Sequence, residues 1–260
     1  MVTRARDQAG ELVRLLESLG AEVFAFFATM IVGVEDPTSL DAALRRVAEF
    51  DWIIFTSGNA VHFVAERCTV LGIDPKRIQT PAPRIAAVGE STAGFGRRVG
   101  LRLDYVAAQQ TALGLAKELS HELNGCKILL PRGDHAGPEI PSALRDAGAQ
   151  VTEVLTYRTV GMDHTESQLR EVVKQSPAAM CFASPSAFRY FMKEFDAATM
   201  KHFAENSAFA SIGPTTTAAI RSAGFQVQIQ AAAPTMPALV EAIEHYFVHD
   251  CRTGIGAKTP

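Results

Sequence analysis

Short runs of apolar residues alternate with longer amphipathic stretches along the chain. Each run is followed by a small polar turn and then by ten or more residues in a helical pattern. This alternation is typical of parallel sheets that are covered by helices. The clearest strand candidates are Trp52–Phe55, Ile85–Val88, Lys127–Leu130, Ala179–Phe182 and Phe209–Ile212. The pattern therefore predicts an α/β fold.

The two halves of the chain repeat the same segments in the same order. Residues 51–60 correspond to 178–187, residues 85–93 to 209–217, and residues 20–23 to 148–151. Because the segments keep both their order and their spacing, we expect two similar α/β halves. Two such halves would leave a ligand-binding cleft between them.

The repeat is unequal at its start. In the second half a full strand, Lys127–Leu130, precedes Pro131 and Arg132, whereas only Met1–Thr3 precede the corresponding Arg4. Either the first strand of the first half is short, or the natural chain begins a few residues earlier. We expect the latter.

Small polar turns follow four of the predicted strands, where parallel sheets bind their ligands. The turns cover residues 56–59, 89–92, 184–186 and 213–216. Ordinary helix capping is sufficient to explain any one of them. However, glycine, hydroxyl groups and helix N-termini together also suit a carboxylate or a phosphate. The two interpretations are compatible, because a cap uses only some of the N–H groups.

Composition excludes several classes of protein. Of the 260 residues, 47% are hydrophobic and 20% are charged. The formal net charge is −3 and there is no basic block, so the charge distribution argues against a nucleic-acid surface. No apolar run is long enough to span a membrane, and residues 1–20 are charged and amphipathic, unlike a signal peptide. The four cysteines are widely spaced, which supports neither a disulfide framework nor a zinc site. We therefore expect a reduced, soluble, cytoplasmic protein that has no membrane or nucleic-acid partner.

Nucleotide and metal sites are weakly supported. Gly94–Gly96 form a G-x-G, but this lies within a helical pattern and not after a strand, as a dinucleotide site would require. His245 and His249 have the i, i+4 spacing of metal ligands, with Asp250 and Cys251 adjacent. However, this segment lies at the end of the chain beside the tail formed by residues 252–260, so we predict no physiological metal site there and disfavour a nucleotide cofactor.

Tyr157 lies near the end of a strand-like run, residues 151–160, on the same face as Thr159. A half-buried strand tyrosine with its hydroxyl at the rim is the simplest interpretation. The corresponding run in the first half, residues 23–31, has no tyrosine. This asymmetry makes Tyr157 a candidate for a functional role.

These segments together resemble the uroporphyrinogen-III synthase family. The matching motifs, in chain order, are Val2–Arg4, Phe50–Ser57, Asn59–Val61, Ala87–Gly89, Leu130–Arg132, Glu153–Thr159, Ser184–Ser186 and Ile212–Thr216. The resemblance depends on their order and spacing over nearly the whole chain. There are two departures: Phe26-Phe27 stand where many members have a proline, and Ala183 replaces the usual threonine before Ser-Pro-Ser.

The resemblance implies two α/β domains with parallel sheets, joined by two antiparallel linker strands near residues 27–32 and 156–160. One domain would comprise residues 1–28 and 161–260, and the other residues 29–160. This arrangement places a cleft between the domains.

The resemblance also implies an activity, the cyclisation of the linear tetrapyrrole hydroxymethylbilane to uroporphyrinogen III, with loss of water and inversion of ring D. This reaction belongs to tetrapyrrole biosynthesis and needs neither cofactor nor metal. The substrate carries eight carboxylates, which suit helix N-termini and hydroxyl groups. The enzyme is expected to act as a monomer that makes a transient contact with the enzyme supplying its substrate.

Residue roles follow from the same resemblance. Tyr157 is the catalytic candidate, which would assist departure of the substrate hydroxyl by hydrogen bonding. The expected substrate-binding residues are Arg4, Ser57, Asn59, Thr92, Arg132, Ser184, Ser186, Thr215 and Thr216.

Two alternatives remain open. The chain could be a non-catalytic, ligand-sensing member of the same fold that binds an anionic small molecule. It could also be an unrelated two-domain anion-binding protein of the periplasmic type, although the absence of a signal peptide argues against this.

Overall fold

A computed structural model describes residues 1–4, 6–79, 83–109 and 111–250 of the chain. The chain divides into two compact units. Unit 1 contains Met1–Met30 together with the chain from Val160 onward, and unit 2 contains Ile31–Thr159. Cys251 and the segment 252–260 lie outside the described residues.

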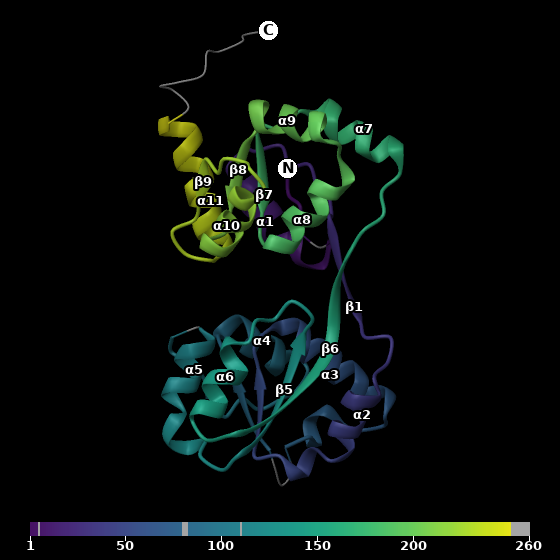
Figure 1. The fold of residues 1–260 in the computed structure, drawn as a ribbon, viewed down its shortest axis with the longest axis vertical. Helices are drawn as coiled ribbons and strands as arrows, with labels where there is room; N and C mark the ends of the chain where they lie inside the picture. Colours follow the sequence, from purple (N-terminus) through teal and green to yellow (C-terminus); the bar gives the residue numbers. More distant parts are fainter. Residues whose placement is uncertain (5, 80–82, 110, 251–260) are drawn as a thin grey trace. The chain divides into compact units, whose positions relative to one another are not determined.

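A six-stranded sheet forms the centre of unit 2 (Figure 1). Its strands are β1 (Thr29–Gly33), β2 (Trp52–Phe55), β3 (Arg84–Ala87), β4 (Tyr105–Val106), β5 (Lys127–Gly133) and β6 (Gln150–Gly161), in the spatial order β1-β6-β5-β2-β3-β4. All the pairings between β6, β5, β2, β3 and β4 are parallel. The first residues of β1 and the last residues of β6 belong to unit 1.

Helices cover both faces of this sheet. They are α2 (Thr38–Arg45), α3 (Gly58–Val70), α4 (Glu90–Arg98), α5 (Ala112–Glu118) and α6 (Glu139–Asp146), with short 3₁₀ turns at Val47–Glu49, Pro75–Arg77 and Ser120–Glu122. Alternate residues of β2 enter different cores, because successive strand side chains point to opposite faces. Ile53 and Phe55 pack with α2 and α3, whereas Trp52 and Ile54 pack with α5 and α6.

Unit 1 contains a smaller parallel sheet, β7-β8-β9, formed by β7 (Ala179–Phe182), β8 (Ala208–Ser211) and β9 (Ile229–Gln230). Met1–Thr3 lie beside β7, and Val2 forms isolated parallel bridges with Cys181 and Ala25. The helices are α1 (Arg6–Ser18), α7 (Glu166–Gln175), α8 (Pro185–Glu194), α9 (Ala197–Asn206), α10 (Pro214–Ser222) and α11 (Met236–His245), followed by a π-helical turn, Tyr246–Asp250.

The prediction of an α/β fold with parallel sheets covered by helices is confirmed. The five expected strands correspond to β2, β3, β5, β7 and β8, although β5 continues to Gly133. The run 23–31 forms a named strand only from Thr29 onward. Its first part has just Met1–Thr3 beside it, so only an isolated bridge forms there.

No helix among the described residues is long and apolar enough to cross a membrane. Cys68, Cys126 and Cys181 are free thiols. Burial raises the pKa of the Cys68 thiol to about 11.

Candidate active site

A register shift between β5 and β6 orients Tyr157. Arg132 lies opposite Leu155, but the next residue of β5, Gly133, lies opposite Tyr157, so Thr156 is passed over. Thr156 is buried and its hydroxyl donates a hydrogen bond to the Arg132 carbonyl over 3.2 Å. Bulges of this kind redirect the next side chain of a strand. Here the shift brings Tyr157 beside Gly133, at the carboxyl end of the sheet.

Gly133 leaves the space that the tyrosine ring occupies. A Cβ atom at this position would lie 2.5 Å from both Cε2 and Cζ of Tyr157, and 2.8 Å from its hydroxyl oxygen. Phe63 of α3 stacks on the same ring, with 5.9 Å between the ring centroids and 18° between the planes. The ring is therefore held by close packing.

The Tyr157 hydroxyl is paired with Ser57, whose Oγ lies 3.0 Å from the phenol oxygen. Ser57 is the N-cap of α3, and its Oγ also accepts a hydrogen bond from the Ala60 N–H over 3.2 Å. A serine hydroxyl has one proton to donate. When Ser57 donates that proton to the phenol oxygen, the phenol proton is available to a ligand.

An exposed aromatic side chain covers Gly58, the residue that follows Ser57. Phe95 of α4 is 39% exposed, and its ring covers Gly58 so closely that a Cβ atom there would collide with it. The Arg98 guanidinium lies 4.1 Å from the centroid of the same ring. Phe95, Phe63 and Gly133 were not identified from the sequence, because nothing in their spacing indicates that they meet Ser57 or Tyr157.

Two other predicted residues of unit 2 lie in the first turns of helices. Asn59 is the second residue of α3 and is half-buried, and Thr92 is the third residue of α4 and is buried. The N-cap residue of α4 is Gly89, which has no side chain that could cap this helix. Its first backbone N–H groups can therefore serve an anionic ligand.

Arg132 is engaged with the protein itself. Its guanidinium pairs with Glu153 and donates hydrogen bonds to the carbonyls of Ala136 and Gly137. Burial raises the pKa of Glu153, but the Arg145 and Arg132 guanidiniums outweigh that effect and leave the pKa lowered. The contacts of Arg132 thus hold the loop that follows β5.

Unit 1 contains the repeat counterparts of these turns. Ser184 caps α8 by accepting a hydrogen bond from the Ala187 N–H over 3.1 Å, and its Oγ lies 3.0 Å from that of Ser186. The N-cap residue of α10 is Gly213, which has no side chain that could cap this helix; in its first turn Thr215 is exposed and Thr216 is buried. Among the turns singled out from the sequence, each unit therefore has one that ends in a serine-capped helix and one in which a glycine precedes the helix.

The remaining predicted residue of unit 1 is Arg4. It is half-buried, and one guanidinium nitrogen lies 3.2 Å from the Met236 sulfur.

The structure sorts the predicted residues into two groups. One group, in unit 2, comprises Ser57, Asn59, Thr92, Arg132 and Tyr157; the other, in unit 1, comprises Arg4, Ser184, Ser186, Thr215 and Thr216. Ser57 and Ser184 are helix caps, as the simpler interpretation of their turns predicted. In unit 2 the hydroxyl of the capping Ser57 pairs with that of Tyr157, whereas in unit 1 the hydroxyl of the capping Ser184 lies next to that of Ser186.

The described side chains include no group of three His, Cys, Asp or Glu residues that could hold a metal ion. The imidazole rings of His245 and His249 lie 4.8 Å apart. Of the two adjacent residues, Cys251 and the side chain of Asp250 are outside what the structure describes.

Two α/β units with parallel sheets, whose strands end in hydroxyl-rich turns and helix N-termini, define a class of protein suited to a small anionic ligand. The family model described as Uroporphyrinogen-III synthase HemD matches residues 10–241. The chain therefore belongs to the uroporphyrinogen-III synthase family.

Individual relatives agree with this assignment. The chain is 29% identical over 254 residues to a protein of Synechococcus elongatus named uroporphyrinogen-III synthase, covering 95% of this chain and 94% of that one. It is 29% identical over 251 residues to a chloroplastic uroporphyrinogen-III synthase of Oryza sativa, covering 94% of this chain and 78% of that one. The crystal structure of uroporphyrinogen-III synthetase from Helicobacter pylori has the same fold, with a TM-score of 0.64, 20% identity, and coverage of 86% of this chain and 93% of that one.

Proposed function

We propose that this chain catalyses the cyclisation of hydroxymethylbilane to uroporphyrinogen III, with loss of water and inversion of ring D. Family membership over residues 10–241 supports this activity. The structural observation that carries it is the Ser57–Tyr157 hydroxyl pair, 3.0 Å apart at the carboxyl end of the unit 2 sheet.

The pair can assist the first chemical step. An electron-rich pyrrole expels its hydroxymethyl oxygen as water when that oxygen takes up a proton, and loss of the pyrrole N–H proton then leaves a neutral azafulvene. Tyr157 donates to the departing oxygen while Ser57 donates to the phenol oxygen, which compensates the negative charge that develops there. A phenol is a weak acid, so this assistance lowers the barrier without being indispensable.

Most of the remaining catalysis is positioning. Ring D must attack through a spiro route that inverts it, and this requires the flexible chain to be held in a folded conformation. Phe95, which covers Gly58 in the turn after Ser57, offers an exposed apolar surface against which a pyrrole ring can stack.

The carboxylates of the substrate are assigned to polar groups of both units. We propose that they bind the uncapped N-termini of α4 and α10 and nearby side chains. The side chains are those predicted from the sequence: Arg4, Ser57, Asn59, Thr92, Arg132, Ser184, Ser186, Thr215 and Thr216.

The decisive test supplies purified protein with hydroxymethylbilane made in situ, then oxidises the product and separates the porphyrin isomers. We expect the type III isomer. Tyr157→Phe should slow its formation by about 10- to 100-fold, since one positioned proton donor contributes on that order or more. Tyr246→Phe, a matched change in unit 1, should have no effect. Formation of the type I isomer alone, at the spontaneous rate, would favour a non-catalytic member of the fold instead.

The proposal has further parts. The sequence-predicted domains, residues 1–28 with 161–260 and residues 29–160, are the two functional domains. The enzyme works in the cytoplasm as a monomer and contacts the enzyme that supplies its substrate only transiently. Cell fractionation tests the cytoplasmic location, and sedimentation equilibrium tests the monomeric state. Cross-linking during turnover tests the transient contact.

A further inference from the structure

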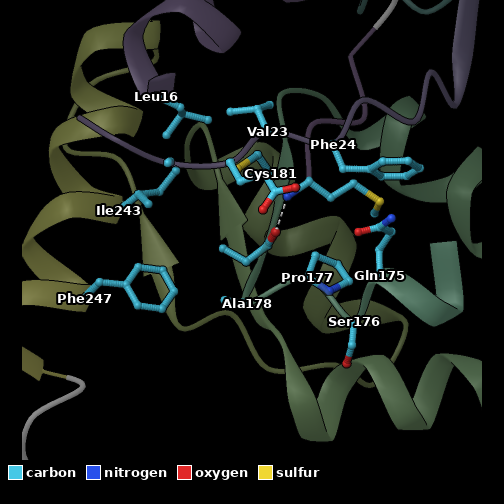
Figure 2. A pocket seen from close by; sticks show the side chains of 14 residues that line it. Leu16, Val23, Phe24, Gln175, Ser176, Pro177, Ala178, Cys181, Ile243 and Phe247 are labelled. Carbon is cyan, nitrogen blue, oxygen red and sulfur yellow. Dashed lines mark hydrogen bonds between the residues drawn. The ribbon is translucent and has the colours of Figure 1, made fainter. Parts of the chain in front are cut away.

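An apolar groove lies in unit 1 at the amino end of β7 (Figure 2). Leu16, Ile243 and Phe247 line it, and Glu22 is the charged residue among the described side chains around it. These side chains therefore offer no positive charge to a ligand that carries carboxylates. A side chain that can offer one lies in unit 2, on α4.

Helix α4 ends in two consecutive arginines that have different surroundings. Arg97 pairs with Glu90, which begins the same helix. The Arg98 guanidinium instead lies over the ring of Phe95, 4.1 Å from its centroid. Both arginines are exposed and lie in the last turn, where a positive charge interacts favourably with the helix dipole. The dipole explains a cation at either position, but it does not explain why Arg98 stacks on Phe95.

The guanidinium of Arg98 has donors to spare. Within the described part of the chain, no carboxylate pairs with it and no oxygen accepts a hydrogen bond from it. Carboxylates pair with most other arginines of unit 2, among them Arg67, Arg84 and Arg132. A guanidinium that stacks on an aromatic ring keeps its N–H groups at the edge of its own plane, where they can bind both oxygens of a carboxylate.

Phe95 connects this guanidinium with the turn that begins α3. Long side chains of a helix lean toward its N-terminus, and Nη1 of Arg98 would lie 3.8 Å from a Cβ atom at Gly94, one turn earlier. The Phe95 ring covers Gly58, which follows the α3 cap Ser57. The ring therefore contacts both the guanidinium and a turn at the carboxyl end of the unit 2 sheet.

We propose that Phe95 and Arg98 form a subsite for one pyrrole ring of the substrate. The pyrrole lies against the exposed part of the Phe95 ring, and one of its carboxylate side chains pairs with the Arg98 guanidinium. This subsite rests on the proposed function and adds Arg98 to it as a specificity-determining residue.

The chemistry of the contact decides which kinetic constant it affects. A carboxylate side chain keeps its charge throughout the reaction, so Arg98 stabilises the bound substrate and the transition state equally. Loss of such an interaction raises KM and leaves kcat unchanged.

The first test compares Arg98→Met with Arg97→Met, which removes the same charge from the preceding residue. Arg98→Met should raise the KM for hydroxymethylbilane about 10-fold, the factor expected for one lost charge-assisted pair, and should change kcat by less than about two-fold. Arg97→Met should leave both constants unchanged, because its exposed pair with Glu90 contributes little. Arg98→Lys keeps the charge but not the planar donor group, so it should restore only part of the affinity.

A second measurement does not depend on turnover. A pyrrole that carries two carboxylate side chains is titrated into isotope-labelled protein, and the backbone amide signals of residues 58 and 94–98 are followed by NMR. The dicarboxylate should shift these signals, and Arg98→Met should weaken its binding about 10-fold. The dimethyl ester of the same pyrrole, which has the ring without the charges, should not shift them.

Equal KM values for Arg97→Met and Arg98→Met would overturn the proposal. So would a titration in which the ester shifts the same amide signals as strongly as the dicarboxylate. A wild-type protein that forms no type III isomer but binds the dicarboxylate through Arg98 would support the subsite and count against the proposed function, so the two failures are distinguishable.

Discussion

Replacing Gly133 with alanine tests whether the packing around Tyr157 positions its hydroxyl. The added methyl group would lie 2.5 Å from two ring carbons of Tyr157. Non-bonded carbon atoms pack at roughly 3.5 to 4 Å. The ring must therefore retreat by about 1 Å, and the stacked Phe63 and the β5–β6 pairing limit where it can go.

The magnitude follows from that displacement. Overpacking a well-packed site of this kind costs about 1 to 3 kcal/mol of stability. The Tyr157 hydroxyl also leaves its 3.0 Å contact with Ser57. Because a misplacement of about 1 Å in a positioned group lowers a rate by about 100-fold, we expect Gly133→Ala to approach the loss caused by Tyr157→Phe.

The assay is the initial rate of type III isomer formation, measured together with the free energy of unfolding. Gly10→Ala in α1 is the matched control, because a Cβ atom there meets only the end of Arg14, at 3.6 Å. That variant should keep full activity and gain up to about 1 kcal/mol of stability from helix propensity.

A double variant separates positioning from general damage. If Gly133 acts through the hydroxyl, adding Gly133→Ala to Tyr157→Phe should lower the rate by less than about three-fold, although stability still falls. The reasoning is refuted if Gly133→Ala leaves the rate unchanged, or if it lowers the rate equally in both backgrounds.

Three further substitutions have defined outcomes. Ser57→Ala should lower stability by about 1 kcal/mol through loss of the α3 cap, and it should also slow the reaction. Ser57→Thr should retain the cap. Urea unfolding measures the effect on stability, and the isomer assay measures the effect on the rate. Gly58→Ala should push the Phe95 ring aside and raise the substrate KM more than it lowers kcat, and equal effects on both would argue against a binding role. Asp41→Asn should remove an acid-sensitive part of the folding free energy. Hydrogen bonds from Arg67 hold the pKa of Asp41 below its usual range. The stabilisation from this pair is therefore complete above about pH 4 and is lost as the pH falls through the lowered pKa. Parallel acid-unfolding curves for the wild type and the Asp41 variant would contradict it.

The pattern of apolar residues correctly predicted the buried strands. Trp52–Phe55 and Ala179–Phe182 form strands with the predicted bounds, because all or nearly all of their side chains are buried and a strand buried on both faces is apolar without interruption. The same reasoning was less accurate for residues 23–31. An apolar run forms a strand only where a neighbouring backbone pairs with it, and the three residues Met1–Thr3 pair with little of this one.

The candidate site was predictable only in part. The turns around Ser57 and Ser184 were identified because capping residues follow strands in a recognisable order. Tyr157 was singled out by its absence from the other half of the repeat. Neither signal shows that Ser57 and Tyr157 meet, since they are separated by 100 positions in the chain.

The sequence by itself determined the α/β class, the duplication, the buried strands and the capped turns. These follow from side-chain periodicity and local capping, which involve residues within a few positions of one another. Only the tertiary structure showed the pairing of Tyr157 with Ser57, the space at Gly133 and the cover of Phe95 over Gly58. These features depend on strand register and on contacts between distant segments, and a shift of one residue in register would alter them without changing the pattern along the chain.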